Sequence, residues 1–309
     1  MRRSRVRVGA VVIALTVVLA ACSSAQGETG PAAGPADFAG LVDVGGRNLY
    51  LECHGSGSPT VVLQSGFPNA ADIWSVGVER PPSVMQGVAA FARVCAYDRP
   101  GSTRISTPEG LPADQPTPGR SDQAPMPRTA ADVVAELHAL LAAAGVPGPY
   151  VVVGHSLGGL FSQLYAQTYP ADVAGVVLVD PTPPAVRDLL PPALWESFAQ
   201  SVERPESPVP GYTLEAYDLT ASTDQVRDAP APPRVPATIL VAGAVDPVPP
   251  GDPSAEAIAA IERVRPEAYA RLAQSIPGSQ LVTVPDTTHY IQILRPDVVI
   301  GAVRSAAGR

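Results

Sequence analysis

Runs of apolar residues alternate with helical patterns along most of this 309-residue chain. Several runs are rich in valine and leucine and lack a polar alternation, which is typical of strands buried on both faces. Between them, apolar residues recur at helical spacing and stop near glycine or proline. Predicted strands cover residues 59–64, 92–98, 150–153, 173–179, 237–243 and 280–284, and predicted helices cover residues 129–144, 160–166, 254–274 and 297–306.

This alternation predicts an α/β domain with a mostly parallel sheet and helices on both faces. An opening β-hairpin is predicted for residues 41–45 and 47–53, which two glycines separate. Residues 103–127 contain six prolines and predict no regular structure. Residues 182–235 hold short apolar clusters among prolines and predict a cap inserted over the sheet edge. The alternative for this insertion is a surface excursion that touches no substrate.

The N-terminal segment differs in composition from the rest of the chain. Arg2, Arg3, Arg5 and Arg7 precede an apolar run over residues 8–21, which is the pattern of an export signal. Fourteen apolar residues are short for a membrane span. The chain has a formal net charge of −8, and removal of the four arginines makes it more acidic still. Nucleic acid is therefore not an expected partner.

The apolar run ends at Leu19-Ala20-Ala21-Cys22, which resembles the lipobox of bacterial lipoproteins, in which the cysteine is lipidated and becomes the new N-terminus. We therefore expect a signal peptide over residues 1–21, a lipidated Cys22, a flexible tether over residues 22–40 and a folded domain over residues 41–309. Such a protein is exported, and it is either anchored by its lipid to the outer face of the bacterial cytoplasmic membrane or secreted. An ordinary cleaved signal peptide and an uncleaved anchor stay open as alternatives.

A Gly-x-Ser-x-Gly motif, centred on Ser156, lies between a predicted buried strand and a predicted helix. In such a strand-to-helix turn the serine takes a strained backbone conformation that exposes its hydroxyl, and the flanking glycines allow close packing. The motif alone is a weak signal, but its structural context makes Ser156 the candidate nucleophile. The alternative is a glycine-rich turn with a serine that has no chemical role.

A serine hydroxyl needs a base within hydrogen-bond reach, and that base needs an acid to orient it. The chain has four histidines. His289 follows the last predicted strand and lies at the carboxyl edge of the sheet, where the serine turn also opens, so we predict that it is the base. Structural or solvent-exposed roles are expected for the other three, His54, His138 and His155.

Two aspartates compete for the orienting acid. Asp246 comes just after the penultimate strand, and Asp180 comes just after the strand that follows the serine helix. Both positions lie at the same sheet edge. We predict that Asp246 is the orienting acid, because on this architecture the acid more commonly follows the penultimate strand. We assign Asp180 to bracing the start of the cap.

A tetrahedral intermediate also needs two backbone donors for its oxyanion. The N–H of Leu157, directly after the nucleophile, is the first candidate. The second is an N–H from the loop after residues 59–64, for which Phe67 is the best position. The alternative role for Phe67 is packing alone.

With these motifs in this order, the chain resembles the α/β-hydrolase superfamily from Leu41 to its C-terminus. The order Ser156, Asp246, His289 and the segment 93–101 are similar to esterase- and lipase-like members. The resemblance implies an α/β-hydrolase fold: an eight-stranded sheet with an antiparallel second strand, a helical cap and no cofactor. One departure is that the usual His-Gly pair before the oxyanion loop is Ser65-Gly66 here. We take Asp98-Arg99 as structural, in an ion pair or a turn brace.

In that fold, the strands that contain Cys53 and Cys95 are neighbours in the sheet. Export places the chain in an oxidising compartment, where a disulfide is stable. The resemblance therefore implies a Cys53–Cys95 disulfide, and two inert buried thiols are the alternative.

The resemblance implies a carboxylic ester hydrolase that works through an acyl-enzyme on Ser156. Its expected substrate is a small-molecule or lipid ester, and thioesters, lactones and amides stay open. A non-catalytic lipid- or ligand-binding lipoprotein on the same fold is the alternative, and perhydrolysis on the same residues would be a side reaction. The sequence shows no metal-ligand cluster and no phosphate-binding glycine loop.

Overall fold

The computed structural model describes residues 37–76, 82–106, 112–247 and 255–309, which all belong to one compact unit. The predicted signal peptide, Cys22 and most of the predicted tether lie outside the described residues. None of the described helices is long and apolar enough to cross a membrane.

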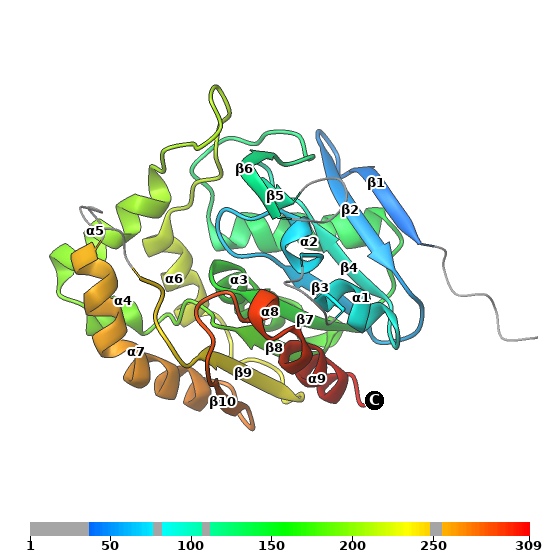
Figure 1. The fold of residues 1–309 in the computed structure, drawn as a ribbon. Coiled ribbons are helices and arrows are strands. Elements are labelled where there is room, and N and C mark those ends of the chain that lie inside the picture. Colours follow the sequence, from blue (N-terminus) through cyan, green and yellow to red (C-terminus); the bar gives the residue numbers. More distant parts are fainter. Residues whose placement is uncertain (1–36, 77–81, 107–111, 248–254) are drawn as a thin grey trace, which may run out of the picture. The chain divides into compact units, whose positions relative to one another are not determined.

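The fold is built on an eight-stranded sheet (Figure 1). Its strands lie in the order β1-β2-β4-β3-β7-β8-β9-β10, and all neighbours are parallel except that β2 runs antiparallel to β1 and β4. The predicted fold, with its antiparallel second strand, is therefore confirmed. The strands are β1 (Phe38–Asp43), β2 (Asn48–His54), β3 (Thr60–Gln64), β4 (Val94–Tyr97), β7 (Tyr150–His155), β8 (Val173–Val179), β9 (Ala237–Ala242) and β10 (Gln280–Val284).

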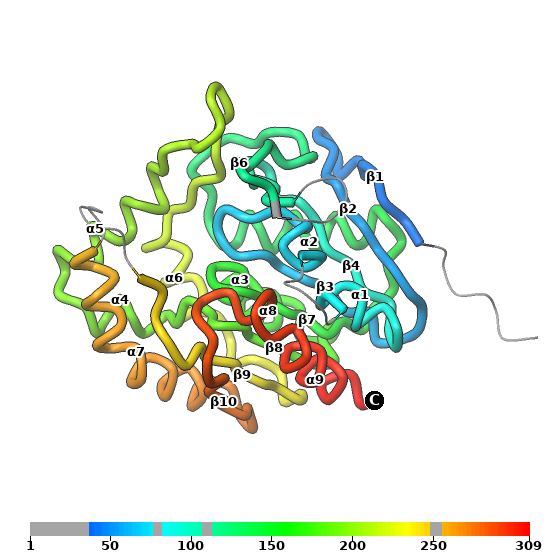
Figure 2. The backbone as a smooth tube through the Cα atoms, in the orientation of Figure 1, coloured from blue at the N-terminus to red at the C-terminus, as the bar shows by residue number. Residues whose placement is uncertain are grey.

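Helices cover both faces of the sheet, which explains why its central strands are apolar throughout. On one face, α1, α8 and α9 share a buried apolar cluster with the strands. On the other face, α2, α3 and α7 form a second cluster that continues into the cap. Figure 2 traces the chain from β1 at one sheet edge to its end after α9. These helices are α1 (Val84–Ala89), α2 (Ala130–Ala143), α3 (Leu157–Thr168), α7 (Ala255–Ser275), α8 (Ile291–Leu294) and α9 (Pro296–Ala306), with 3-10 turns at Ala71–Trp74 and Pro170–Asp172.

Three helices occupy the predicted cap between β8 and β9: α4 (Val186–Leu189), α5 (Pro192–Glu203) and α6 (Leu219–Asp228). Trp195 of α5 donates a hydrogen bond from its indole N–H to Thr220 of α6, at 3.0 Å. The apolar side chains of the cap join the same cluster that covers the sheet. The cap is thus packed onto the domain through a continuous core.

Two predicted boundaries need correction. The sheet begins at Phe38, inside the predicted tether, because residues 38–40 pair with residues 51–53 of β2. The region 103–127, predicted to be irregular, contains the two-stranded hairpin of β5 (Thr103–Ser106) and β6 (Pro112–Pro118). Prolines cannot donate ladder hydrogen bonds, but a two-stranded ribbon tolerates them because each strand has an unpaired edge.

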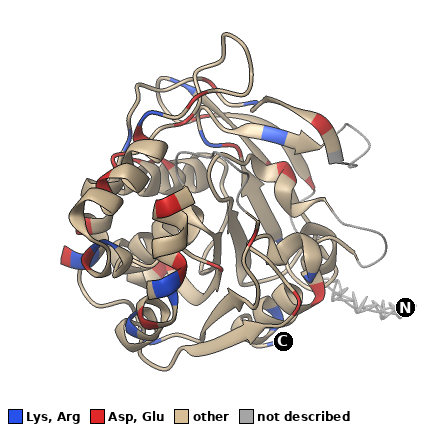
Figure 3. Ribbon diagram, turned by 60° about the vertical axis from the view of Figure 1, so that its left-hand side comes forward, with Lys and Arg blue, Asp and Glu red and all other residues tan. Residues whose placement is uncertain are grey.

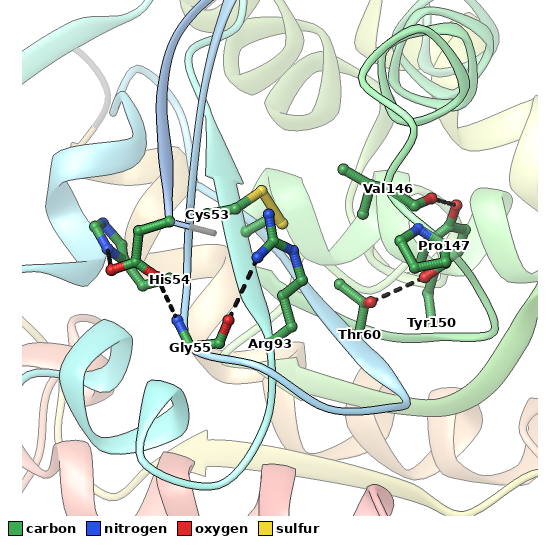
Figure 4. The surroundings of a disulfide bond; sticks show 10 residues. Cys53, His54, Gly55, Thr60, Arg93, Val146, Pro147 and Tyr150 are labelled. Carbon is green, nitrogen blue, oxygen red and sulfur yellow. Dashed lines mark hydrogen bonds and ion pairs between the residues drawn. A yellow bond between two sulfur atoms is a disulfide. The ribbon is translucent and has the colours of Figure 1, made fainter. Parts of the chain in front are cut away.

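The predicted disulfide is present. Cys53 of β2 and Cys95 of β4 lie directly opposite each other in the antiparallel register, and their sulfurs are bonded. Figure 4 shows the bond beside Arg93, whose guanidinium donates to the carbonyl of Gly55 at 3.3 Å. Both cysteines are fully buried. The bond therefore ties the antiparallel part of the sheet to the parallel part.

We expect removal of this bond to lower stability. The bridge closes a sequence separation of 42 residues, for which the loss of chain entropy in the unfolded state corresponds to roughly 4 kcal/mol. Urea unfolding of the Cys53→Ala/Cys95→Ala variant should show a free energy of unfolding lower by about 2–4 kcal/mol. Intact mass with alkylation provides the control: two thiols that alkylate without prior reduction would contradict the bridge.

Candidate active site

The turn between β7 and α3 places Ser156 where its side chain can meet a ligand. Ser156 has φ 53° and ψ −122°, a strained conformation for a residue with a Cβ. A Cβ on Gly154 would lie 2.3 Å from the carbonyl oxygen of Gly158, and one on Gly158 would lie 2.4 Å from the carbonyl oxygens of Gln64 and Ser65. Only glycine fits these two positions, so the motif is set by the close approach of β7, α3 and β3.

The carboxyl ends of four neighbouring strands supply the polar groups of the site. Ser156 follows β7, Asp180 follows β8, Asp246 lies in the loop after β9, and His289 lies in the loop after β10. All four line one cavity of about 370 Å³. The parallel sheet therefore brings together residues that are up to 133 positions apart in the sequence.

His289 forms its ring hydrogen bond with Asp180 and not with Asp246. The distance from His289 Nδ1 to Asp180 Oδ2 is 2.7 Å. Asp246 instead accepts a hydrogen bond from the backbone N–H of His289, at 3.0 Å. The prediction that Asp246 orients the histidine ring is therefore wrong: the ring is bonded to Asp180, and Asp246 holds the backbone of the His289 loop.

The surroundings of the two carboxylates explain why the ring is bonded to Asp180. Asp180 is buried at the end of β8, and its Oδ1 accepts hydrogen bonds from the Ala242 N–H (2.9 Å), Arg265 (2.7 Å) and the Tyr269 hydroxyl (3.1 Å). Asp246 is exposed to solvent. Three donors on one oxygen fix the Asp180 carboxylate so that its other oxygen faces His289.

These contacts also keep Asp180 ionised. Burial alone would raise the pKa of Asp180, but the hydrogen bond and electrostatic interaction with His289, the positive charge of Arg265 and the hydrogen bond from the Ala242 N–H outweigh burial and hold the pKa below its usual range. Arg265 and Tyr269 lie four residues apart on α7 and were not predicted as site residues. Their spacing places them on one helix face, but nothing in the sequence indicates that this face meets Asp180.

His155, next to the nucleophile, has a structural position that links two loops. Its side chain is buried, and its Nε2 lies 2.9 Å from the carbonyl oxygen of His289. Burial, together with the electrostatic interaction with the neighbouring His289 ring, lowers the pKa of His155 to about 3, so the His155 ring is neutral and its Nε2 carries the proton that it donates. His155 thus fastens the His289 loop to the serine turn.

The loop after β3, residues 65–67, packs against the serine turn; we call it the β3 loop. A Cβ on Gly66 would lie 2.9 Å from Ser156 Cβ and 2.6 Å from His155 Nδ1, so the close approach requires glycine. No hydrogen bond involves the Phe67 N–H within the described residues. The Phe67 ring packs edge-on against Tyr217, with centroids 6.5 Å apart. Leu157 begins α3, where N–H groups have no intrahelical partner.

Apolar residues of the cap and of α7 complete the cavity. Pro183, Val186 and Phe198 come from the insertion, and Ile258 and Ile261 come from α7. The insertion therefore contributes directly to the cavity that contains Ser156. A second cavity, of about 530 Å³, lies between α3, α6 and α7 and includes none of the four polar residues of the site.

The described residues include no cluster of three or more His, Cys, Asp or Glu side chains that could hold a metal ion. In Figure 3, acidic and basic residues are interspersed, mostly along helices and loops. The cavity contains two acidic side chains besides Asp180, namely Asp246 and Glu262, and one arginine, Arg265. Arg265 is ion-paired with both Asp180 and Glu262, so its one positive charge is shared by two of the three carboxylates of the cavity.

Comparison with known proteins identifies the fold family. A family model described as "Alpha/beta hydrolase family" matches residues 53–302. Uncharacterized protein YqjL of Bacillus subtilis (strain 168) is 31% identical over 127 residues, 41% of each chain. The Pimeloyl-[acyl-carrier protein] methyl ester esterase of Chromobacterium violaceum is 41% identical over 91 residues, 28% of this chain and 34% of that protein. The matched segments span less than half the length of these curated relatives.

Among solved structures, a thermophilic esterase from Thermogutta terrifontis is similar with a TM-score of 0.57. The two sequences are 21% identical, and the match covers 87% of this chain and 97% of that chain. At this level of identity the likeness concerns the fold, and the site must be judged from its own residues.

The geometry predicts a spectroscopic difference between the two aspartates. The proton between His289 Nδ1 and the buried Asp180 carboxylate should give a far-downfield ¹H NMR signal, because a short charge-assisted hydrogen bond deshields it. Asp180→Asn should abolish that signal, and the matched Asp246→Asn variant should keep it. His289→Gln assigns the signal. If the signal disappeared in Asp246→Asn and persisted in Asp180→Asn, the structure would be contradicted.

Proposed function

Because the chain belongs to the alpha/beta hydrolase family, we propose that it is a serine hydrolase that cleaves carboxylic esters through an acyl-enzyme. One observation carries the proposal: a strained, accessible Ser156 shares a cavity with His289, whose Nδ1 is bonded to a buried, ionised Asp180. A nucleophile, a base and an orienting acid are thereby present with distinct environments.

In the proposed mechanism, Ser156 Oγ attacks the ester carbonyl carbon. The Nδ1–H of His289 donates to Asp180, so the neutral ring has its free lone pair on Nε2, which takes the serine proton. Asp180 stabilises the imidazolium that forms. Collapse of the tetrahedral intermediate breaks the bond to the alcohol, which leaves with the proton from His289 Nε2.

Deacylation repeats these steps with water. His289 Nε2 takes a proton from the attacking water, whose oxygen bonds to the acyl carbon. Collapse of the second tetrahedral intermediate then breaks the bond to Ser156 Oγ, which receives the proton from His289 Nε2, and the carboxylic acid is released. In both steps the negative oxygen is stabilised by the N–H groups of Leu157 and Phe67. Asp246 takes no proton in this scheme. Its bond to the His289 backbone holds the loop in place.

The shape of the cavity indicates the substrate class. Its walls of proline, valine, isoleucine and phenylalanine suit an apolar acyl or alcohol group, and its volume of about 370 Å³ suits a small ester. An ester substrate is also the chemistry named for the relative from Chromobacterium violaceum. The second candidate is a lipid- or ligand-binding protein without turnover, which the same apolar cavity would serve.

The cellular context of the proposal rests on residues 1–22 alone. Export and a lipid at Cys22 would hold the domain at the outer face of the cytoplasmic membrane, close to amphiphilic esters. Without lipidation the same domain would be secreted.

The first test is hydrolysis of p-nitrophenyl esters, from acetate to palmitate, by the domain without residues 1–36. We expect turnover of short and medium chains and a loss of at least about 1000-fold in kcat for Ser156→Ala, which removes the nucleophile. A folded wild-type domain that hydrolyses no ester would favour the binding function instead.

The two aspartates should differ in the same assay. Asp180→Asn should lower kcat by about 1000-fold or more, because the amide cannot stabilise the imidazolium and favours the wrong tautomer. The matched Asp246→Asn variant loses only a charge-assisted bond to a main-chain N–H, and we expect a change below about 10-fold. A larger loss in Asp246→Asn than in Asp180→Asn would reverse the assignment of the acid.

A further inference from the structure

A buried arginine, Arg99, lies under the β3 loop and contacts no group of the proposed triad. It follows β4 and is 1% exposed. Its Nη1 donates to the carbonyl oxygen of Ser65 at 2.6 Å, and its Nη2 donates to the carbonyl oxygen of Gly66 at 3.0 Å. One guanidinium thus holds two consecutive carbonyls of the loop that packs on Ser156.

These two bonds determine where the neighbouring N–H groups point. In a trans peptide unit the C=O of one residue and the N–H of the next point in opposite directions. The carbonyl of Gly66 faces Arg99 and also accepts from the Asn69 N–H at 2.8 Å. The N–H of Phe67, in the same peptide unit, therefore points away from Arg99 and is left without a partner among the described residues.

The other side of Arg99 is held by the cap. Glu215, between α5 and α6, is fully buried and accepts from Arg99 Nε at 2.9 Å and from Nη2 at 2.7 Å. The hydroxyl of Tyr217 lies 3.0 Å from Nε and donates to Glu215 at 2.8 Å. Burial alone would lower the pKa of Arg99, but the charge of Glu215 outweighs it and raises the pKa, so the guanidinium stays charged.

The cap segment also contacts the turn after Arg99 directly. The Glu215 N–H donates to the carbonyl of Gly101 at 2.9 Å, and the Tyr212 hydroxyl donates to the carbonyl of Ser102 at 2.8 Å. A Cβ on Gly101 would lie 2.5 Å from the Glu215 nitrogen, so this contact is close-packed. The β3 loop, the Arg99 turn and the cap are consequently one hydrogen-bonded unit.

We propose that Arg99 is a positioning residue that aims the Phe67 N–H into the oxyanion hole, and that its ion pair with Glu215 makes this alignment depend on the cap. The inference rests on the proposed hydrolase function and deepens it. The planar guanidinium of arginine suits this arrangement, because it donates hydrogen bonds to two loop carbonyls on one side and to a carboxylate on the other. A lysine has a single ammonium and cannot reproduce all these bonds.

Arg128 provides a matched control. It is also buried and ion-paired, with Arg128 Nη2 2.8 Å from Glu136, and its backbone pairs with the cap segment through hydrogen bonds to Ala216 and Asp218. No hydrogen bond links Arg128 to the β3 loop within the described residues. A purely structural contribution of a buried arginine should therefore appear in both Arg99→Lys and Arg128→Lys.

The experiment measures kcat and KM for p-nitrophenyl butyrate in wild type, Arg99→Lys, Arg128→Lys and Glu215→Gln. Each rate is divided by the number of active sites that a fluorophosphonate labels at completion, which removes any misfolded fraction. Inhibition by an alkyl boronic acid, which forms a tetrahedral adduct with the serine, reports the oxyanion hole separately. Thermal unfolding of all four proteins reports stability.

We expect kcat per site to fall by about 10- to 100-fold in Arg99→Lys, less than or equal to the loss of a whole oxyanion donor, while KM changes by less than about 3-fold. Boronate affinity should fall in parallel. Glu215→Gln, which leaves the arginine and removes its charged partner, should show the same pattern with a smaller loss. Arg128→Lys should keep the wild-type kcat whatever its melting temperature.

The inference is overturned if Arg99→Lys and Glu215→Gln both melt at lower temperature but keep kcat per site and boronate affinity within about 3-fold of wild type. If Arg99→Lys fails to fold, Glu215→Gln alone decides between the two results. Turnover by wild type and its loss in Ser156→Ala test the hydrolase function in the same assay. Failure of that function is thus distinguishable from failure of the role of Arg99.

Discussion

The close approach of three backbones around Ser156 is the constraint on which the rest of the site depends. The turn after β7, the start of α3 and the β3 loop meet at distances that leave no room for a Cβ at positions 66, 154 and 158. Such packing fixes the serine in a strained conformation that no isolated peptide would keep. Buried apolar clusters on both faces of the sheet surround this turn, and the Ser156 hydroxyl is presented at the end of β7.

Given that fixed serine, the groups around His289 divide their tasks by environment. Asp180 and Asp246 follow adjacent parallel strands, and both contact the same histidine, one at the ring and one at the backbone. The sheet brings both carboxylates within reach of His289, so the strand order alone does not determine which of them binds the ring. Helix α7 determines the partner of the ring. Its residues Arg265 and Tyr269 bind one oxygen of Asp180, and the other oxygen then faces the His289 ring.

This division shows what the sequence could predict. The apolar runs predicted the parallel core, and the glycines predicted the serine turn. Because the chain has few histidines, His289 could be predicted as the base. The two cysteines lie opposite each other because the strand order implied by the resemblance is the observed one. The partner of His289, the contacts of Arg99 with Glu215 and the β3 loop, and the contact of Arg265 with Asp180 were missed for one physical reason. Each of these contacts joins segments that are distant in the sequence and come together only when the helices pack. Local hydrophobic periodicity contains no information about such contacts. The β5–β6 hairpin was missed because its prolines resemble those of a loop.

The Arg99 network raises the question of why a charged group is buried beneath a loop. Removing a guanidinium and a carboxylate from water costs several kcal/mol for each ion, about as much as their attraction returns, so apolar side chains of similar volume would often be at least as stabilising. Stability is therefore a poor explanation for Arg99 and Glu215. Main-chain carbonyls of a loop without regular structure need donors, and apolar side chains supply none. Donors in a rigid planar fork orient those carbonyls, and through the planar peptide they orient the N–H groups of Gly66 and Phe67, which point away from Arg99. The burial of this ion pair is best explained by the direction it gives to backbone dipoles, which is the property that stabilisation of a developing negative charge requires.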